Sequence, residues 1–136
     1  MSVRIAIFAS GSGSNAENII KYFSHNQKFI FPVILSNNPE AFIHQRAKKL
    51  KIPSLTLSKN EFIEGIKVLE ILNDYKIDYI ILAGFLLRVP QNIIEAFPNK
   101  IINIHPALLP KYGGKGMYGD RVHKAVIEAG ETHSGI

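Results

Sequence analysis

Apolar residues follow two patterns along this chain, short continuous runs and longer stretches with helical spacing. Continuous runs are typical of strands that are buried on both faces of a sheet. The runs predict five strands, at residues 3–9, 29–35, 54–57, 79–83 and 100–104. The segments between them must then supply the connections.

These intervening segments carry apolar residues three or four positions apart, which is the spacing of one helix face. A first helix should bury Ala16, Ile19, Ile20 and Phe23. A second is predicted to begin at Asn38-Pro39, because proline favours a first helical position, and to turn Ile43, Ala47 and Leu50 inward. A third should begin near Asn60 with Phe62, Ile66, Leu69 and Leu72 along one side, and a short one should cover residues 90–97.

Strands that alternate with helices indicate an α/β fold with a doubly wound, mostly parallel sheet. Right-handed crossovers and the usual reversal of strand order predict the order 3-2-1-4-5. Ligands of such sheets bind outside the carboxyl ends of the strands. We therefore expect a site where the loops after Ala9, Ala83 and Ile104 meet.

Composition narrows the chemistry of that site. The 136 residues include no cysteine, which excludes disulfides, thiolate nucleophiles and cysteine-ligated metals. The net charge of +5 favours an anionic ligand, and because the lysines are scattered we expect a small phosphorylated molecule rather than nucleic acid. The opening residues lack the pattern of a signal peptide, and no apolar stretch is long enough to span a bilayer, so we expect a cytoplasmic protein without a membrane partner.

The loop Gly11-Ser12-Gly13-Ser14-Asn15-Ala16 is the first candidate site, since it links a strand to a helix start. Glycines let the backbone approach an anion, and free amides at a helix start favour a phosphate. The loop also fits the dinucleotide pattern G-x-G-x-x-A, but Ser36-Asn37-Asn38 follows the second strand where a ribose-binding acidic residue would stand. Ser12, Ser14 and Asn15 add side-chain donors, so phosphate binding by this loop is favoured over dinucleotide binding. The alternative is a tight turn capped by Ser14 or Asn15.

Two further segments follow strand ends. Leu82 to Pro90 could line a slot for a flat ring, or could be a buried loop that fills the core. In Asn103-Ile104-His105-Pro106 the amide and the imidazole are two residues apart, which places them on one side of an extended segment. An amide can donate to an oxyanion and a histidine can transfer protons near neutrality. A strand end that is merely capped is the alternative, and metal binding is disfavoured because no other histidine has ligand spacing to His105.

In this order and spacing, Ser10 to Asn15, Leu-Ala-Gly-Phe and Asn-Ile-His-Pro-Ala-Leu-Leu-Pro resemble the folate-dependent formyltransferases. The early G-S-G-S-N loop is similar to the glycinamide ribonucleotide branch of that family. The resemblance implies a Rossmann-like formyltransferase fold and the transfer of a formyl group from 10-formyltetrahydrofolate to the amine of glycinamide ribonucleotide in purine (IMP) biosynthesis. The amine would attack directly, through a tetrahedral intermediate, without a metal or an acyl-enzyme.

The resemblance also implies a role for each matching residue. Gly13, Ser14 and Asn15 would hold the substrate phosphate, Asn103 would bind the formyl oxygen, and His105 would polarise the carbonyl and assist proton transfer. The folate would contact Lys59, Leu86, Leu87, Arg88, Val89 and Asn103. Lys59 stands where the family commonly has arginine, which keeps the charge and loses the planar fork.

The family's catalytic aspartate lies in a segment that follows the equivalent of the last residues here. Residues 1–136 are therefore expected to be a single formyltransferase domain that lacks its C-terminal part and has low or no activity. The partner would be a small phosphorylated substrate, and the protein a monomer or homodimer. The alternatives are another 10-formyltetrahydrofolate-using transferase or hydrolase, and a nucleotide-binding module without chemistry.

Overall fold

A computed structural model describes residues 2–104, and Met1 and residues 105–136 lie outside the described part. Met1–Ile102 form one compact unit, and of the second unit, Asn103–Ile136, only the first two residues are described. The strands are β1 (Val3–Phe8), β2 (Phe29–Ser36), β3 (Ser54–Thr56), β4 (Tyr79–Ala83) and β5 (Ile101–Ile104). The helices are α1 (Ser14–Tyr22), α2 (Ile43–Leu50), α3 (Lys59–Glu64), α4 (Ile66–Asp74) and α5 (Gln91–Ala96). No helix within residues 2–104 combines the length and the hydrophobicity that crossing a membrane requires.

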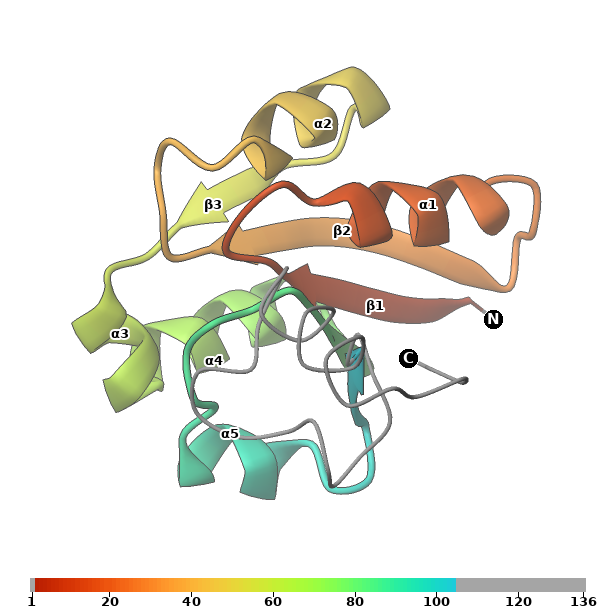
Figure 1. Cartoon of the computed structure of the whole chain (residues 1–136). Helices are drawn as coiled ribbons and strands as arrows, with labels where there is room; N and C mark the ends of the chain where they lie inside the picture. The colour runs from red at the N-terminus through yellow and green to blue at the C-terminus, as the bar shows by residue number, and fades with distance from the viewer. Residues whose placement is uncertain (1, 105–136) are drawn as a thin grey trace, which may run out of the picture. The chain divides into compact units, whose positions relative to one another are not determined.

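The strands form one sheet in the order β3-β2-β1-β4-β5, which confirms the predicted α/β fold and strand order (Figure 1). β1 is paired in parallel on both sides, and Ile7 stands opposite Ile34 of β2 and Ile81 of β4. β3 continues the parallel pairing beyond β2. The bounds of all five strands agree with the predicted ones to within one residue, because continuous apolar runs occur where both faces of a strand are covered.

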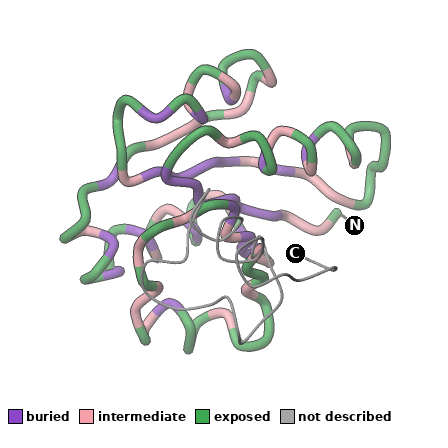
Figure 2. The backbone as a smooth tube through the Cα atoms, in the orientation of Figure 1, coloured by how far each residue is buried: buried purple, intermediate pink, exposed green. Residues whose placement is uncertain are grey.

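Both faces of the sheet are covered by helices, α1 and α2 on one side and α3, α4 and α5 on the other (Figure 1). Successive strand residues point to opposite faces. Ala6 and Phe8 of β1 accordingly join the core beneath α3, α4 and α5, where Phe8 packs edge-on against Phe62 and Phe85 with ring centroids 5.7 and 5.4 Å apart. Buried positions follow the strands and the inner faces of the helices (Figure 2).

The predicted start of the second helix is wrong. α2 begins at Ile43, and Asn38 and Pro39 lie in a turn before it. The side chain of Asn38 accepts a hydrogen bond from the amide of Glu40 at 3.0 Å, and its carbonyl accepts one from the amide of Ala41 at 3.2 Å. Asparagine and proline favour such turns as strongly as they favour helix starts, so the pair does not distinguish the two.

The predicted third helix is two helices that meet at Gly65, and the predicted inward face is partly wrong. Gly65 has φ +76° and forms both the end of α3 and the start of α4. This left-handed residue changes the rotation of the second helix about its axis, so that Val68 is buried and Ile66 is 63% exposed. The side chain of Asn92 packs on the junction, where its Nδ2 donates to the carbonyl of Glu64 at 2.8 Å.

Candidate functional site

Ser10 connects the loops that follow three strands. Its amide donates to the carbonyl of Gly84 after β4 at 3.1 Å. Its hydroxyl donates to Oδ1 of Asn37 after β2 at 2.6 Å and accepts from the amide of Leu86 at 2.8 Å. The side chain is almost fully buried, with 5% exposed. The loops after β1 and β4 are thus held together at the carboxyl edge of the sheet, as predicted; the loop after Ile104 lies outside the described residues.

The glycine-rich loop turns into α1 at Gly13, which has φ +77°. The first helical hydrogen bond runs from the amide of Glu17 to the carbonyl of Gly13 at 2.9 Å. Neither Ser14 nor Asn15 caps the helix with its side chain, so the alternative of a side-chain-capped turn is wrong. A Cβ atom at Gly13 would lie 2.9 Å from Cβ of Ile43, which is a sterically forbidden approach. The loop therefore needs glycine here both for its conformation and for its contact with α2.

α2 binds the outer side of the same loop. The amide of Ile43 donates to the carbonyl of Gly11 at 3.1 Å, and Nε of Arg46 donates to the carbonyl of Ser12 at 2.7 Å. Within residues 2–104, no acceptor is found for the backbone amides from Ser12 to Ala16. Successive unpaired amides at the start of a helix form a concave site for an anion such as phosphate.

Glu17 is an acidic residue in the first turn of α1, close to this anion site, and two cations compensate its charge. Its carboxylate lies 3.2 Å from Nη1 of Arg46 and 3.3 Å from Nζ of Lys21. The hydrogen bonds from Arg46, and then those from Lys21, hold the pKa of the Glu17 carboxyl below its usual value. The pairing keeps Glu17 ionised and offsets the repulsion that a lone carboxylate would exert on a bound anion.

The segment after β4 alternates between core and surface. Phe85, Leu87 and Val89 are partly buried against the core, while Leu86 is 61% exposed and Arg88 is also exposed. Phe85, Leu87 and Val89 thus contribute to the core, as one interpretation of this segment expected, while Leu86 and Arg88 are exposed. The predicted contacts of Leu86, Leu87, Arg88 and Val89 with a ligand stay a prediction.

Two other predicted site residues lie on separate elements. Lys59 is the exposed first residue of α3, and Ser58 before it caps that helix with its side chain, which accepts from the amide of Glu61 at 3.1 Å. Asn103 is exposed on β5, and His105 lies outside the described residues. The predicted pairing of Asn103 with His105 stays a prediction. Among the described residues, no three His, Cys, Asp or Glu side chains gather as metal ligands would.

Three residues contribute to this site without having been predicted, Ser10, Asn37 and Arg46. Ser10 and Asn37 lie in predicted loops after β1 and β2, but their mutual hydrogen bond was not predictable from either loop alone. Arg46 falls on a predicted helix and contacts Ser12, 34 residues earlier in the chain. No local pattern indicates such a distant contact.

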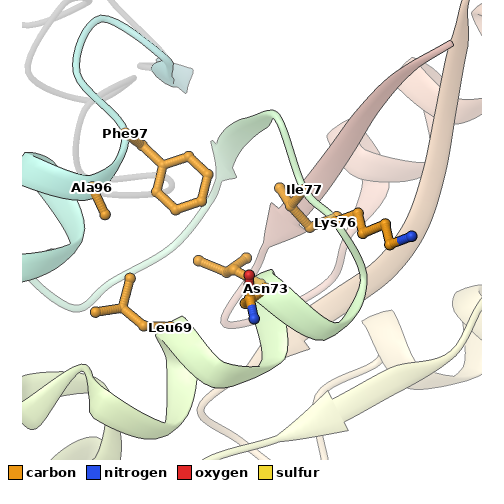
Figure 3. A pocket seen from close by; sticks show the side chains of 7 residues that line it. Leu69, Asn73, Lys76, Ile77, Ala96 and Phe97 are labelled. Carbon is orange, nitrogen blue, oxygen red and sulfur yellow. The ribbon is translucent and has the colours of Figure 1, made fainter. Parts of the chain in front are cut away.

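A cavity of about 300 Å³ lies elsewhere in the unit (Figure 3). Ile77 comes just before β4 and Phe97 comes before β5, so these lining residues lie toward the amino ends of the strands, away from the glycine-rich loop. The lining is completed by Leu69, Leu72, Asn73, Lys76 and Ala96. The cavity is thus separate from the candidate site.

Comparisons with known proteins agree with this geometry. Residues 3–136 match the formyl transferase family. The chain is 39% identical over 138 residues to a chloroplastic phosphoribosylglycinamide formyltransferase of Arabidopsis thaliana, covering 97% of this chain and 47% of that protein. It is 32% identical over 137 residues to the phosphoribosylglycinamide formyltransferase of Haemophilus influenzae, covering 97% of this chain and 62% of that protein.

Solved structures give the same result. The fold superposes on the crystal structure of phosphoribosylglycinamide formyltransferase from Anaplasma phagocytophilum with a TM-score of 0.85 at 30% sequence identity, covering 98% of this chain and 62% of that one. The glycinamide ribonucleotide transformylase 1 of Geobacillus kaustophilus gives a TM-score of 0.86 at 27% identity, covering 98% and 71% of the two chains. The chain spans about half the length of the plant relatives and 62% of the Haemophilus protein. The chain belongs to the formyl transferase family.

Proposed function

We propose that this protein transfers the formyl group of 10-formyltetrahydrofolate to the amine of glycinamide ribonucleotide, in purine biosynthesis. The observation that carries the proposal is the row of unpaired amides from Ser12 to Ala16 at the start of α1, which suits the phosphate of a ribonucleotide. The names of the relatives support the same substrate.

The formyl group passes directly from one bound ligand to the other, without a covalent enzyme intermediate. The substrate amine attacks the formyl carbon, a carbon–nitrogen bond forms, and the carbonyl oxygen becomes an oxyanion. Collapse of this tetrahedral intermediate breaks the bond between the formyl carbon and the folate nitrogen, and the proton lost by the amine passes to that nitrogen. Asn103 is proposed to donate a hydrogen bond to the oxyanion, and His105 to assist the proton transfer.

The loop after β4 offers side chains that suit the folate, which is the second ligand of the proposed reaction. Leu86 presents an exposed apolar side chain in the loop after β4, and Arg88 presents a cation. Ser10 ties this loop to the glycine-rich loop, since its hydroxyl accepts from the amide of Leu86 and its amide donates to the carbonyl of Gly84. The glycine-rich loop would then hold the phosphate and the loop after β4 the pterin, and the hydrogen bonds of Ser10 would fix the two loops relative to each other.

The test is a formyl-transfer assay with glycinamide ribonucleotide and 10-formyltetrahydrofolate. It compares residues 1–136 with a chain extended beyond Ile136 to the length of the relatives, and with the extended chain carrying His105→Ala. We expect transfer by the extended chain, low or no transfer by residues 1–136, and a loss of at least a hundredfold in kcat with His105→Ala.

Each alternative has its own outcome in this assay. Formation of formate without formylated product would indicate a hydrolase, and transfer only to another amine would indicate a different transferase. Binding of the ribonucleotide without any transfer would favour a binding module. Full activity of the His105→Ala variant would overturn the role of that histidine.

A further inference from the structure

We propose that Arg46 is a positioning residue for the phosphate site, and that it acts by orienting the peptide group between Ser12 and Gly13. The inference rests on the proposed function, because it assigns a role within the phosphate site. It goes further than the proposed function, because it makes the affinity for the phosphate depend on a side chain of α2 that does not itself contact the ligand.

Arg46 uses its whole guanidinium on the loop and on α1. Nε donates to the carbonyl of Ser12 at 2.7 Å, and Nη2 donates to the Ser12 hydroxyl at 3.3 Å. Nη1 donates to the carboxylate of Glu17 at 3.2 Å. The guanidinium carbon also lies 4.8 Å from the ring centroid of Phe42, which supports one face of the group. These contacts fix the position of the guanidinium relative to the loop.

The orientation of the loop amides follows from these contacts. In a trans peptide the carbonyl and the N–H point in opposite directions. The carbonyl of Ser12 is directed to Arg46, so the amide of Gly13 is directed away from α2. The carbonyl of Gly11 is likewise directed to the amide of Ile43, which turns the amide of Ser12 the same way. Two successive amides are thereby presented together, next to the unpaired amides that begin α1.

Without Arg46, the peptide group between Ser12 and Gly13 loses the hydrogen bond that fixes its orientation. Rotation of that group would bring the carbonyl oxygen toward the anion, where it would repel a phosphate. Direct attraction between the arginine and the phosphate is a competing explanation. It is disfavoured because the carboxylate of Glu17 offsets the charge of the guanidinium at a distance of 3.2 Å.

Two substitutions separate orientation from charge. Glutamine carries its side-chain nitrogen as many bonds from Cα as Nε of arginine, so Arg46→Gln can keep the hydrogen bond to the Ser12 carbonyl while losing the charge. Arg46→Met places a methyl group there and loses both. Lys49→Met serves as the control, since it removes an exposed cation from the last turn of the same helix and, within residues 2–104, its side chain contacts neither Ser12 nor Glu17.

The measurement is titration of the chain extended beyond Ile136 with ribose 5-phosphate, followed by KM and kcat of that chain for the ribonucleotide and its KM for the formyl donor. We expect Arg46→Met to weaken binding of the phosphorylated ligand about tenfold, or about 1.4 kcal/mol. Arg46→Gln should weaken it no more than about threefold, and Lys49→Met should leave it unchanged. The KM for the formyl donor should not change in any variant.

The outcomes separate this inference from the proposed function. Equal weakening by Arg46→Gln and Arg46→Met, or none by either, would overturn the positioning role even if formyl transfer is observed. The expected difference in ribose 5-phosphate affinity without any formyl transfer would support the positioning role and overturn the function. Failure of the unsubstituted chain to bind ribose 5-phosphate or the ribonucleotide would overturn both.

Discussion

Replacing Ser10 by alanine tests whether one hydroxyl supports the candidate site. The substitution leaves the backbone hydrogen bond to Gly84 in place and removes the hydroxyl. Oδ1 of Asn37 then loses its donor, and the amide of Leu86 loses its acceptor. Because Ser10 is only 5% exposed, water cannot readily take the place of the hydroxyl.

The size of the effect follows from the two hydrogen bonds. Each contributes about 1 kcal/mol net, so the free energy of unfolding should fall by about 2 kcal/mol. With an m-value of about 1–3 kcal/mol per M in urea, the denaturation midpoint should decrease by about 1 M. The chain has no tryptophan, so far-UV circular dichroism of the full chain in urea is the suitable measurement.

A double-mutant cycle with Asn37→Ala isolates one of the two contacts. If the hydroxyl of Ser10 and Oδ1 of Asn37 interact as described, the double variant should be less destabilised than the sum of the single variants, by about 1 kcal/mol. A midpoint shift below about 0.2 M for Ser10→Ala, or strictly additive effects in the cycle, would refute the reasoning.

Two further predictions concern α3 and α4. Gly65→Ala should lower the free energy of unfolding by about 2–3 kcal/mol in urea denaturation, because φ is +76° and a Cβ there would lie 2.8 Å from Nδ2 of Asn92. Gly11→Ala is the control, since no atom lies near the Cβ it would add. A similar loss of stability in Gly11→Ala would contradict the prediction. The amide of Ser58 donates to the Glu61 carboxylate and holds the pKa of that carboxyl below its usual value. The stability that this charge supplies is therefore present above the unfolded-state pKa and is lost as the pH falls through the lower, folded-state pKa. Glu61→Gln should therefore be less stable than the unsubstituted protein at pH 7, with a difference that narrows below about pH 4.5 in thermal melts; a difference independent of pH would contradict this assignment.

The sheet was predictable from the sequence because its determinants are local. Runs such as Ile5 to Ala9 are apolar at every position, and such continuous runs are typical of strands that are covered on both faces of a sheet. Short loops and right-handed crossovers then leave few strand orders. The glycine-rich loop was predictable for the same reason, since its glycines and the helix after it are adjacent in the chain.

The start of α2 was missed because Asn38-Pro39 fits a local turn as well as a helix start. The other errors arose where a contact between distant residues decides the structure. Gly65 ends one helix and begins another while the side chain of Asn92, 27 residues later, packs against it. The resulting change in rotation buries Val68 instead of Ile66, although both fit an apolar periodicity. Arg46 likewise binds the Ser12 carbonyl from another helix, and only the three-dimensional arrangement brings them together.

The position of β1 between β2 and β4 has a consequence for synthesis of the protein. β2 follows β1 closely, but the other neighbour of β1 is complete only when Ala83 has been made, about 50 residues after the end of β2. At typical translation rates that interval lasts roughly 2–10 s. For that time one edge of a strand that is apolar at almost every position has no partner from its own chain. The nascent protein therefore exposes an aggregation-prone edge, and a chaperone that shields β1 until β4 emerges should raise the yield of folded protein.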